Sequence, residues 1–131
     1  MKTASYALSA QSTRMRVVSE NLANAESTGK APGADPYQRK TVSFESVMDD
    51  ALGIDVVQVG RVSADKAPFR TEYDPGHVAA DAKGMVKLPN VDMMVELADM
   101  REAMRSYSAN TQIIKQAREM VSMTVDLLRA G

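Results

Sequence analysis

The sequence predicts a mainly α-helical chain with a small β-rich middle, in which N- and C-terminal helices pair as a coiled-coil-like bundle with short strands and loops between them. All five prolines, and every glycine except the terminal one, lie within residues 29–89. Both flanks lack these helix breakers and space their apolar residues three and four apart, as amphipathic helices do. We therefore divide the chain into an N-terminal helix over 1–28, a loop and β-rich segment over 29–89, and a long C-terminal helix over 90–131, which together form one structural unit.

The N-terminal flank carries a weak heptad stripe, whose spacing places its members on one side of a helix. Its members are Met1, Ala4, Leu8, Gln11, Met15, Val18, Leu22 and Ala25. Burying a Leu or Met contributes roughly 1.5–3 kcal/mol, whereas ordering the backbone costs about 1–2 kcal/mol per residue. Gln11 interrupts the stripe and the alanines add little area, so we expect an isolated monomer to be poorly helical at both termini.

The C-terminal flank carries a longer stripe, with Arg118 in one of the expected apolar positions. Its members are Met93, Leu97, Met100, Met104, Tyr107, Thr111, Ile114, Val121, Val125 and Leu128. A second row widens it toward the end: Ile113, Ala117, Met120, Thr124 and Leu127. Asn90 or Asp92 is predicted to cap this helix. A helix over 91–130 would be about 60 Å long, too long for one short N-terminal partner, so part of its stripe must meet another chain.

The middle of the chain contains four short strand-like runs, rich in β-branched residues or alternating apolar and polar positions. They cover residues 41–44, 53–62, 69–73 and 85–88, and residues 28–40 are predicted to form a flexible loop. Strands this short and few can form a ribbon or small sheet, but only a thin core.

Composition excludes several classes of function. The chain has no cysteine, so it can form neither a disulfide nor a thiolate metal site. A lone histidine, His77, sits in a turn-like segment and is not expected to bind a metal. The sequence lacks a phosphate-binding glycine loop, a basic surface signal and an apolar run long enough for a membrane span or a Sec-type signal peptide. We therefore predict no enzyme activity and no catalytic, cofactor or metal site, and any export would need a route without a cleaved signal.

Three amides stand out in the helical flanks. Asn21 and Asn24 lie near the end of the first helix, and Asn110 lies within the second. These amides could simply help to end a helix. Alternatively, they could hydrogen-bond the backbone of a neighbouring helix and fix its register, as a polar residue in a helical seam can.

The stripes and amides together form the predicted assembly interface. Its residues are Leu8, Met15, Val18, Asn21, Leu22, Asn24, Leu97, Met100, Met104, Tyr107, Asn110, Ile114, Val121, Val125 and Leu128. We expect Leu22, Leu97, Met104 and Ile114 to be buried by helix–helix contacts, partly between chains. The alternative is a monomeric cytoplasmic helical module with a binding or chaperone-like role, which should fold at its ends without partners.

Several motifs resemble those of the flagellar basal-body rod family. Leu8-Ser9-Ala10-Gln11, Arg14-Met15 and Asn21 through Gly29 are similar to the N-terminal signature of rod and hook proteins. The middle resembles proximal-rod members at 35–39, 44–45, 68–70, 73–77, Asp81, Gly84 and 89–91, and 106–110 resembles the family's C-terminal helix motif. The sequence departs from the family pattern at Lys30, where a tyrosine usually follows the glycine, and at Val78, where a proline often follows the histidine.

The resemblance implies a structural subunit of the flagellar rod. Such proteins are exported through the flagellar type III apparatus and assemble in the periplasm into a helical tube, with the terminal helices forming its inner layer. The implied partners are other copies of the chain, the rod proteins FlgB, FlgF and FlgG, and the adaptor FliE. The implied role is to transmit motor torque and to enclose the export channel, without cofactors, nucleic acid or a membrane span.

Overall fold

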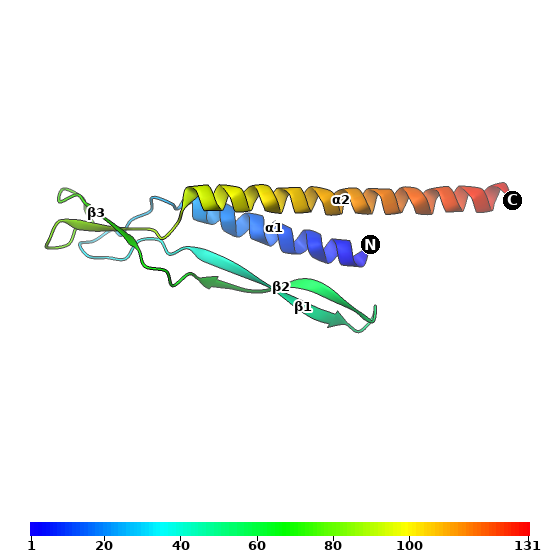
Figure 1. Cartoon of the computed structure of the whole chain (residues 1–131), viewed down its shortest axis with the longest axis horizontal. Coiled ribbons are helices and arrows are strands. Elements are labelled where there is room, and N and C mark those ends of the chain that lie inside the picture. The colour runs from blue at the N-terminus through cyan, green and yellow to red at the C-terminus, as the bar shows by residue number, and fades with distance from the viewer.

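The computed structural model describes all residues from 1 to 131 and shows an elongated molecule (Figure 1). The elements follow one another as α1 (Lys2–Ala23), β1 (Lys40–Asp49), β2 (Ile54–Ala64), β3 (Arg70–Tyr73), β4 (Met85–Leu88) and α2 (Met93–Ala130). Two terminal helices and a small antiparallel strand region confirm the predicted fold class. The two helices run antiparallel, and α2 continues well past the N-terminus of α1 (Figure 1).

Hydrogen bonds of nearby side chains determine where α2 begins and where α1 ends. The Asp92 side chain caps α2 by accepting hydrogen bonds from the backbone N–H groups of Met94 and Val95, at 2.9 and 3.4 Å, which identifies the cap among the two predicted candidates. Without a proline or glycine to interrupt it, α2 extends for 38 residues, or about 57 Å. The first helix ends at Ala23 rather than at residue 28, because the chain then turns and the Asn24 amide bonds the Glu20 carbonyl.

The middle forms two separate two-stranded sheets rather than one sheet. In the first, β1 pairs antiparallel with β2 and the register shifts between Val42 and Phe44. β2 carries one extra residue at this bulge, between Val59 and Val62. Gly60 lies in the bulge, and a Cβ atom there would come within 2.5 Å of the Glu45 side chain. The second sheet pairs β3 with β4, beside the end of the helix pair (Figure 1).

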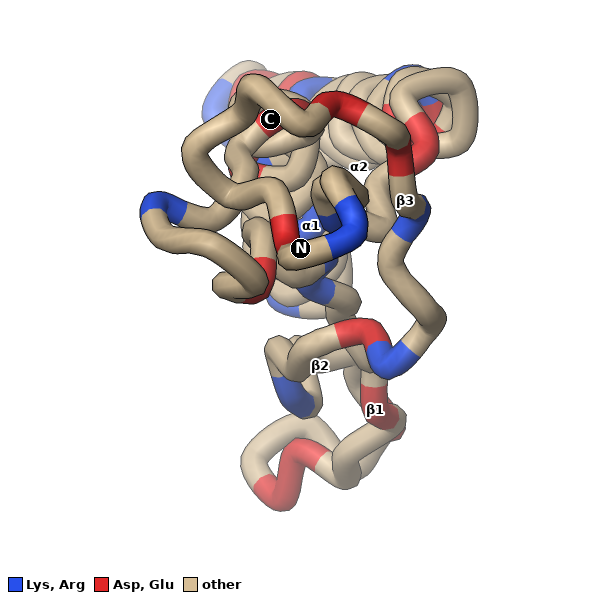
Figure 2. Tube along the Cα trace, turned by 90° about the vertical axis from the view of Figure 1, so that its left-hand side faces the viewer, with Lys and Arg blue, Asp and Glu red and all other residues tan.

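The core is thin, since only 15 of 131 residues are buried. Viewed along the long axis, α1 lies between α2 and the β1–β2 hairpin (Figure 2). The buried apolar residues of these elements are small: Ala4, Ala10, Val17 and Val18 on α1, Val56 on β2 and Ala103 on α2. Many larger apolar side chains remain exposed, most of them on α2 and the hairpin. No helix combines the length and apolar character needed to cross a membrane.

Candidate assembly interface

The line along which α2 contacts α1 differs from the predicted stripe. Ala103 is fully buried on α2, and so is the carboxylate residue Glu96 one heptad earlier. In contrast, the predicted Leu97 and Met104 are 43% and 54% exposed. The small residues of α1 allow the two helices to approach closely at Ala103, and this rotates α2 by one position relative to the apolar pattern. Leu97 and Met104 are therefore not buried within the chain, and a role between chains stays a prediction.

The other predicted interface residues fall into three groups by exposure. Val18 and Asn21 are buried; Leu8, Met15, Leu22, Asn24, Met100, Asn110 and Ile114 are half-buried; Tyr107, Val121, Val125 and Leu128 are exposed. The buried and half-buried members lie in the stretch where the helices overlap. Val121, Val125 and Leu128 belong to the C-terminal third of α2, the end of the helix that continues past the N-terminus of α1 (Figure 1).

The Asn21 side chain joins α1 to the start of β1 and to α2. Its Nδ2 donates to the Lys40 carbonyl at 2.9 Å and to Glu96 Oε2 at 3.3 Å. Its Oδ1 accepts from the Lys40 backbone N–H at 2.9 Å and from the Tyr37 hydroxyl at 2.8 Å. Burial raises the pKa of Tyr37, so its hydroxyl keeps the proton that it donates here. All the donors and acceptors of this buried amide are thus used within the chain.

Within the single chain, the three amides make contacts other than bonds to the backbone of a neighbouring helix. None of them bonds the backbone of a neighbouring helix in the chain: Asn21 bonds the backbone of β1, and Asn24 and Asn110 bond carbonyls of their own helices, at Glu20 and Ser106. Asn24 thus bonds the last turn of α1 in the single chain, and a contact of these amides with a neighbouring chain stays a prediction. The sequence pattern could not reveal the β1 contact, because the bonded residues are far apart in the chain.

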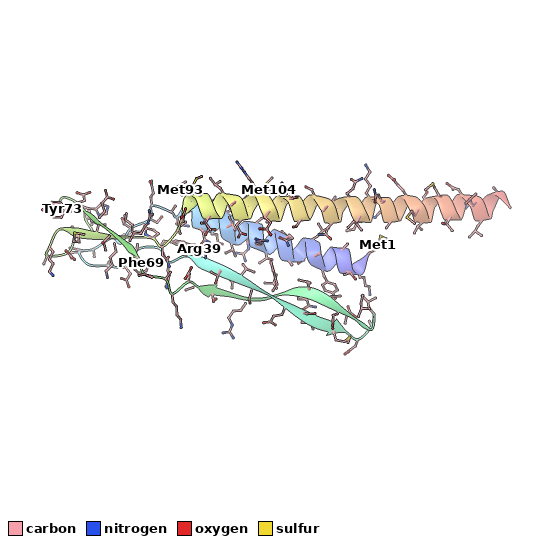
Figure 3. All side chains as sticks on the ribbon, in the orientation of Figure 1. Met1, Arg39, Phe69, Tyr73, Met93 and Met104 are labelled. Atoms are coloured by element: carbon pink, nitrogen blue, oxygen red, sulfur yellow. The ribbon has the colours of Figure 1, made fainter.

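A buried ion pair adjoins Asn21. The guanidinium of Arg39, at the start of β1, donates through Nε to Glu96, whose side chain is inaccessible to solvent, and through Nη1 to Asp65 at 3.1 Å. Figure 3 shows Arg39 where the start of β1 meets the ends of the helices. Burial lowers the pKa of Arg39, but the hydrogen bonds and charges of Glu96 and Asp65 outweigh burial and raise it overall. The guanidinium therefore stays charged and offsets the buried carboxylate.

The side chain of Asn90, just before α2, hydrogen-bonds the backbone near Arg39 and Asp65. Its Oδ1 accepts from the Arg39 backbone N–H at 2.8 Å, and its Nδ2 donates to the carbonyls of Asp65 and Ala67 at 3.1 and 3.0 Å. The pKa of Asp65 is lowered, first because the Ala67 backbone N–H donates to its carboxylate and also because Arg39 lies beside it. We call Asn21, Tyr37, Arg39, Asp65, Asn90 and Glu96 the polar latch.

The helices are also joined by a partly buried ion pair. Arg14 on α1 donates to Asp99 on α2 and lies 3.4 Å from Glu102. The hydrogen bond with Asp99 raises the pKa of Arg14. At the far end of the hairpin, the Tyr6 hydroxyl donates to Asp49 at 3.2 Å. The hairpin is therefore held against α1 at both of its ends.

His77 has a local structural role. Its Nδ1 accepts from the Ala79 backbone N–H at 3.0 Å, and its Nε2 lies 3.4 Å from the Thr28 hydroxyl. No group of three or more histidine, aspartate or glutamate side chains is placed to hold a metal ion.

Substitution of Asn21 and substitution of Asn24 should differ sharply in their effect on the free energy of unfolding. Asn21→Leu should destabilise the chain by roughly 3 kcal/mol or more, because it removes four hydrogen bonds whose partners are partly or fully buried, and a buried group left without a partner costs about 1–3 kcal/mol. Asn24→Leu removes two hydrogen bonds at the end of the helix, one to the Glu20 carbonyl and one from the exposed Ser27 hydroxyl, and should cost about 1–2 kcal/mol. Urea unfolding followed by circular dichroism compares the two variants, and equal midpoints would contradict the buried role of Asn21.

Comparison with known proteins agrees with an assembly role. Residues 1–29 match the family model described as flagella basal body rod protein, and residues 82–127 match the model of the flagellar basal body rod FlgEFG protein C-terminal region. These segments include α1 and most of α2, so the matched parts are the paired helices.

Relatives match along almost the whole chain. The flagellar basal-body rod protein FlgC of Agrobacterium fabrum is 57% identical over 130 residues, covering 99% of this chain and 94% of the relative. The FlgC proteins of Escherichia coli O6:H1 and Bacillus subtilis are 40% and 32% identical, covering 95% and 97% of this chain and 92% and 95% of the relatives. These matches favour a rod subunit over the alternative of a monomeric cytoplasmic module. The chain belongs to the FlgC family of flagellar basal-body rod proteins and is a structural subunit of the rod.

Proposed function

We propose that this chain is a non-catalytic subunit of the proximal rod, exported by the flagellar type III apparatus and assembled in the periplasm through the free end of α2. One observation carries the proposal: every residue from 118 to 131 is exposed, although this segment holds Met120, Val121, Val125 and Leu128. We call residues 118–131 the α2 overhang. Burying each of its Leu, Val or Met side chains in a neighbour would contribute roughly 1.5–3 kcal/mol.

The partners of the α2 overhang are other copies of this chain, the rod proteins FlgB, FlgF and FlgG, and the adaptor FliE. The names of the relatives, all flagellar basal-body rod proteins, support assembly within the rod. Neighbouring large apolar side chains that all remain exposed are typical of a protein–protein interface. Its position on a long, unbroken helix suits side-by-side packing of the helices of neighbouring subunits.

The contacts between α2, α1 and the β1–β2 hairpin suit a mechanical role. Torque passing between subunits through α2 would reach the rest of the chain through Arg14 and the polar latch, which tie α2 to α1 and to the hairpin. A tube of such subunits would transmit torque and enclose the export channel.

Photo-crosslinking in cells tests the partners. A photoreactive amino acid in place of Leu128 should capture rod subunits in isolated basal bodies, because this side chain is 76% exposed in the single chain and lies on the apolar side of the α2 overhang. The matched control places the same amino acid at Ser122, on the polar side of the same segment, and should capture less. Capture of only cytoplasmic proteins at position 128 would contradict the proposal.

A further inference from the structure

The His77 side chain closes a tight turn between β3 and β4. Its Nδ1 accepts a hydrogen bond from the Ala79 backbone N–H at 3.0 Å. A ring nitrogen can accept only while it carries no proton, so the folded chain holds the neutral ring with its proton on Nε2. That nitrogen lies 3.4 Å from the Thr28 hydroxyl and can donate to it. The geometry therefore fixes both the charge and the tautomer of the ring.

Three other turns in the middle of the chain are closed in the same way, but by aspartate. In each, a carboxylate oxygen accepts from the backbone N–H two residues later, at 2.8–2.9 Å: Asp49 with Ala51, Asp65 with Ala67, and Asp81 with Lys83. Aspartate ordinarily takes up a proton only near about pH 4, whereas histidine changes charge between about pH 5 and 8. Of these four turns, only the one at His77 has an acceptor that mild acid removes.

The charged groups around this turn offer the ring no ionic partner. The turn lies between its own loop, residues 74–84, and the facing loop, residues 24–35, whose charged residues are Glu26, Lys30, Asp35, Asp74, Asp81 and Lys83. None of them forms an ion pair with His77, and Asp35 pairs with Lys87 instead. Hydrogen bonds from the backbone N–H groups of Met85 and Lys83 lower the pKa of Asp81, so its own turn stays closed in mild acid.

The turn at His77 also joins the two loops. Ala79 is buried, and its carbonyl accepts from the Gly33 backbone N–H at 3.3 Å. Both loops lie at the end of the molecule beside the start of α2 (Figure 1). A buried N–H group without a partner is unfavourable, so loss of the Nδ1 acceptor should turn the Ala79 backbone toward water. This movement draws its carbonyl away from Gly33.

We propose that His77 is an acid-sensitive switch: when its ring takes up a proton, the Ala79 N–H loses its acceptor and residues 74–84 loosen from residues 24–35. The proton comes from water and binds Nδ1, and the resulting imidazolium can only donate. Because the released form binds the extra proton, the contact stabilises the fold fully above the titration range of histidine and is lost as the pH falls through that range. The switch lies outside the α2 overhang and is independent of the proposed assembly role.

Nuclear magnetic resonance of the ¹⁵N-labelled chain tests the switch, with trimethylamine N-oxide present if the wild-type chain is only partly folded alone. At about pH 7.5, where histidine is ordinarily neutral, the His77 ring proton should lie on Nε2 and the Ala79 amide should be protected from exchange with water. At about pH 5.5, the protection factor of Ala79, corrected for the intrinsic effect of pH on exchange, should fall by about tenfold or more. The protection factor of Gly33 should fall with it, whereas those of Ala67 and Lys83, held by aspartates, should not.

Two variants separate loss of the acceptor from a general effect of acid. His77→Asn places an amide oxygen where it can accept from the N–H two residues later, and this group does not titrate. Its Ala79 amide should therefore be equally protected at both pH values. His77→Ala removes the acceptor, so its Ala79 amide should be unprotected at both, while protection of Lys83 shows that the region remains folded.

Several results would overturn the switch. A ring proton on Nδ1 at the higher pH, or an Ala79 amide that exchanges freely there, would contradict the geometry. Unchanged protection of Ala79 while the ring takes up its proton would show that the contact does not depend on charge. Equal losses at Ala79 and Lys83, or a loss in His77→Asn as large as in the wild type, would assign the effect of acid to other groups.

Discussion

Replacing Arg39 by alanine is expected to destabilise the folded chain by about 3–5 kcal/mol, since it leaves the buried Glu96 carboxylate without its ionic partner. Glu96 is completely buried and would keep only the bond from the Asn21 amide. The loss is a large fraction of the stability available to a chain with so thin a core. Urea unfolding followed by circular dichroism measures it, with trimethylamine N-oxide present if the wild-type chain is only partly helical alone.

Two further variants show whether the effect comes from the buried charge. Arg39→Lys keeps the charge but cannot reach Glu96 and Asp65 with one planar group, so it should lie between wild type and Arg39→Ala. Adding Glu96→Gln to Arg39→Ala should recover part of the loss, because the carboxylate that lacks a partner is gone. The control Lys87→Ala breaks an exposed pair with Asp35 and should cost less than about 1 kcal/mol. Equal losses for Arg39→Ala and Lys87→Ala would contradict the polar latch.

The combined substitution Val121→Asp and Leu128→Asp is expected to abolish swimming while leaving the single chain folded. Both side chains are exposed in the chain, at 56% and 76%, so the charges meet water before assembly. In the rod they would be buried in an apolar contact, where an unpaired carboxylate carries a high desolvation cost. The defect should therefore appear in the count of complete hook–basal bodies and not in the circular dichroism of the chain.

The matched control for the α2 overhang is Ser122→Asp. It adds the same charge between the two substituted positions, but on the polar side of α2, and should leave swimming near the wild-type level. Normal swimming by the double variant, or an equal defect in the control, would show that the apolar side of the α2 overhang does not mediate assembly.

Local chemistry allowed much of the fold to be predicted from the sequence. Prolines and glycines confined to residues 29–89 left two uninterrupted helical flanks, and Asp92 supplied an N-cap at the start of the second. Strand propensity located the four strands, although β1 runs on to Asp49, beyond the predicted end at residue 44. The motifs near Asn21 and Tyr73 indicated the rod family, which the relatives confirm.

Only the tertiary structure decided which side of α2 faces α1 and what Asn21, Arg39 and Glu96 do. The apolar arc of α2 is wide, so periodicity alone cannot distinguish the line through Ala103 from the neighbouring line through Met104. Close approach of small residues selected Ala103, and left the larger apolar side chains for other contacts. The polar latch joins residues as far as 75 positions apart, and such pairs are set by how folded segments meet in space rather than by spacing along the chain.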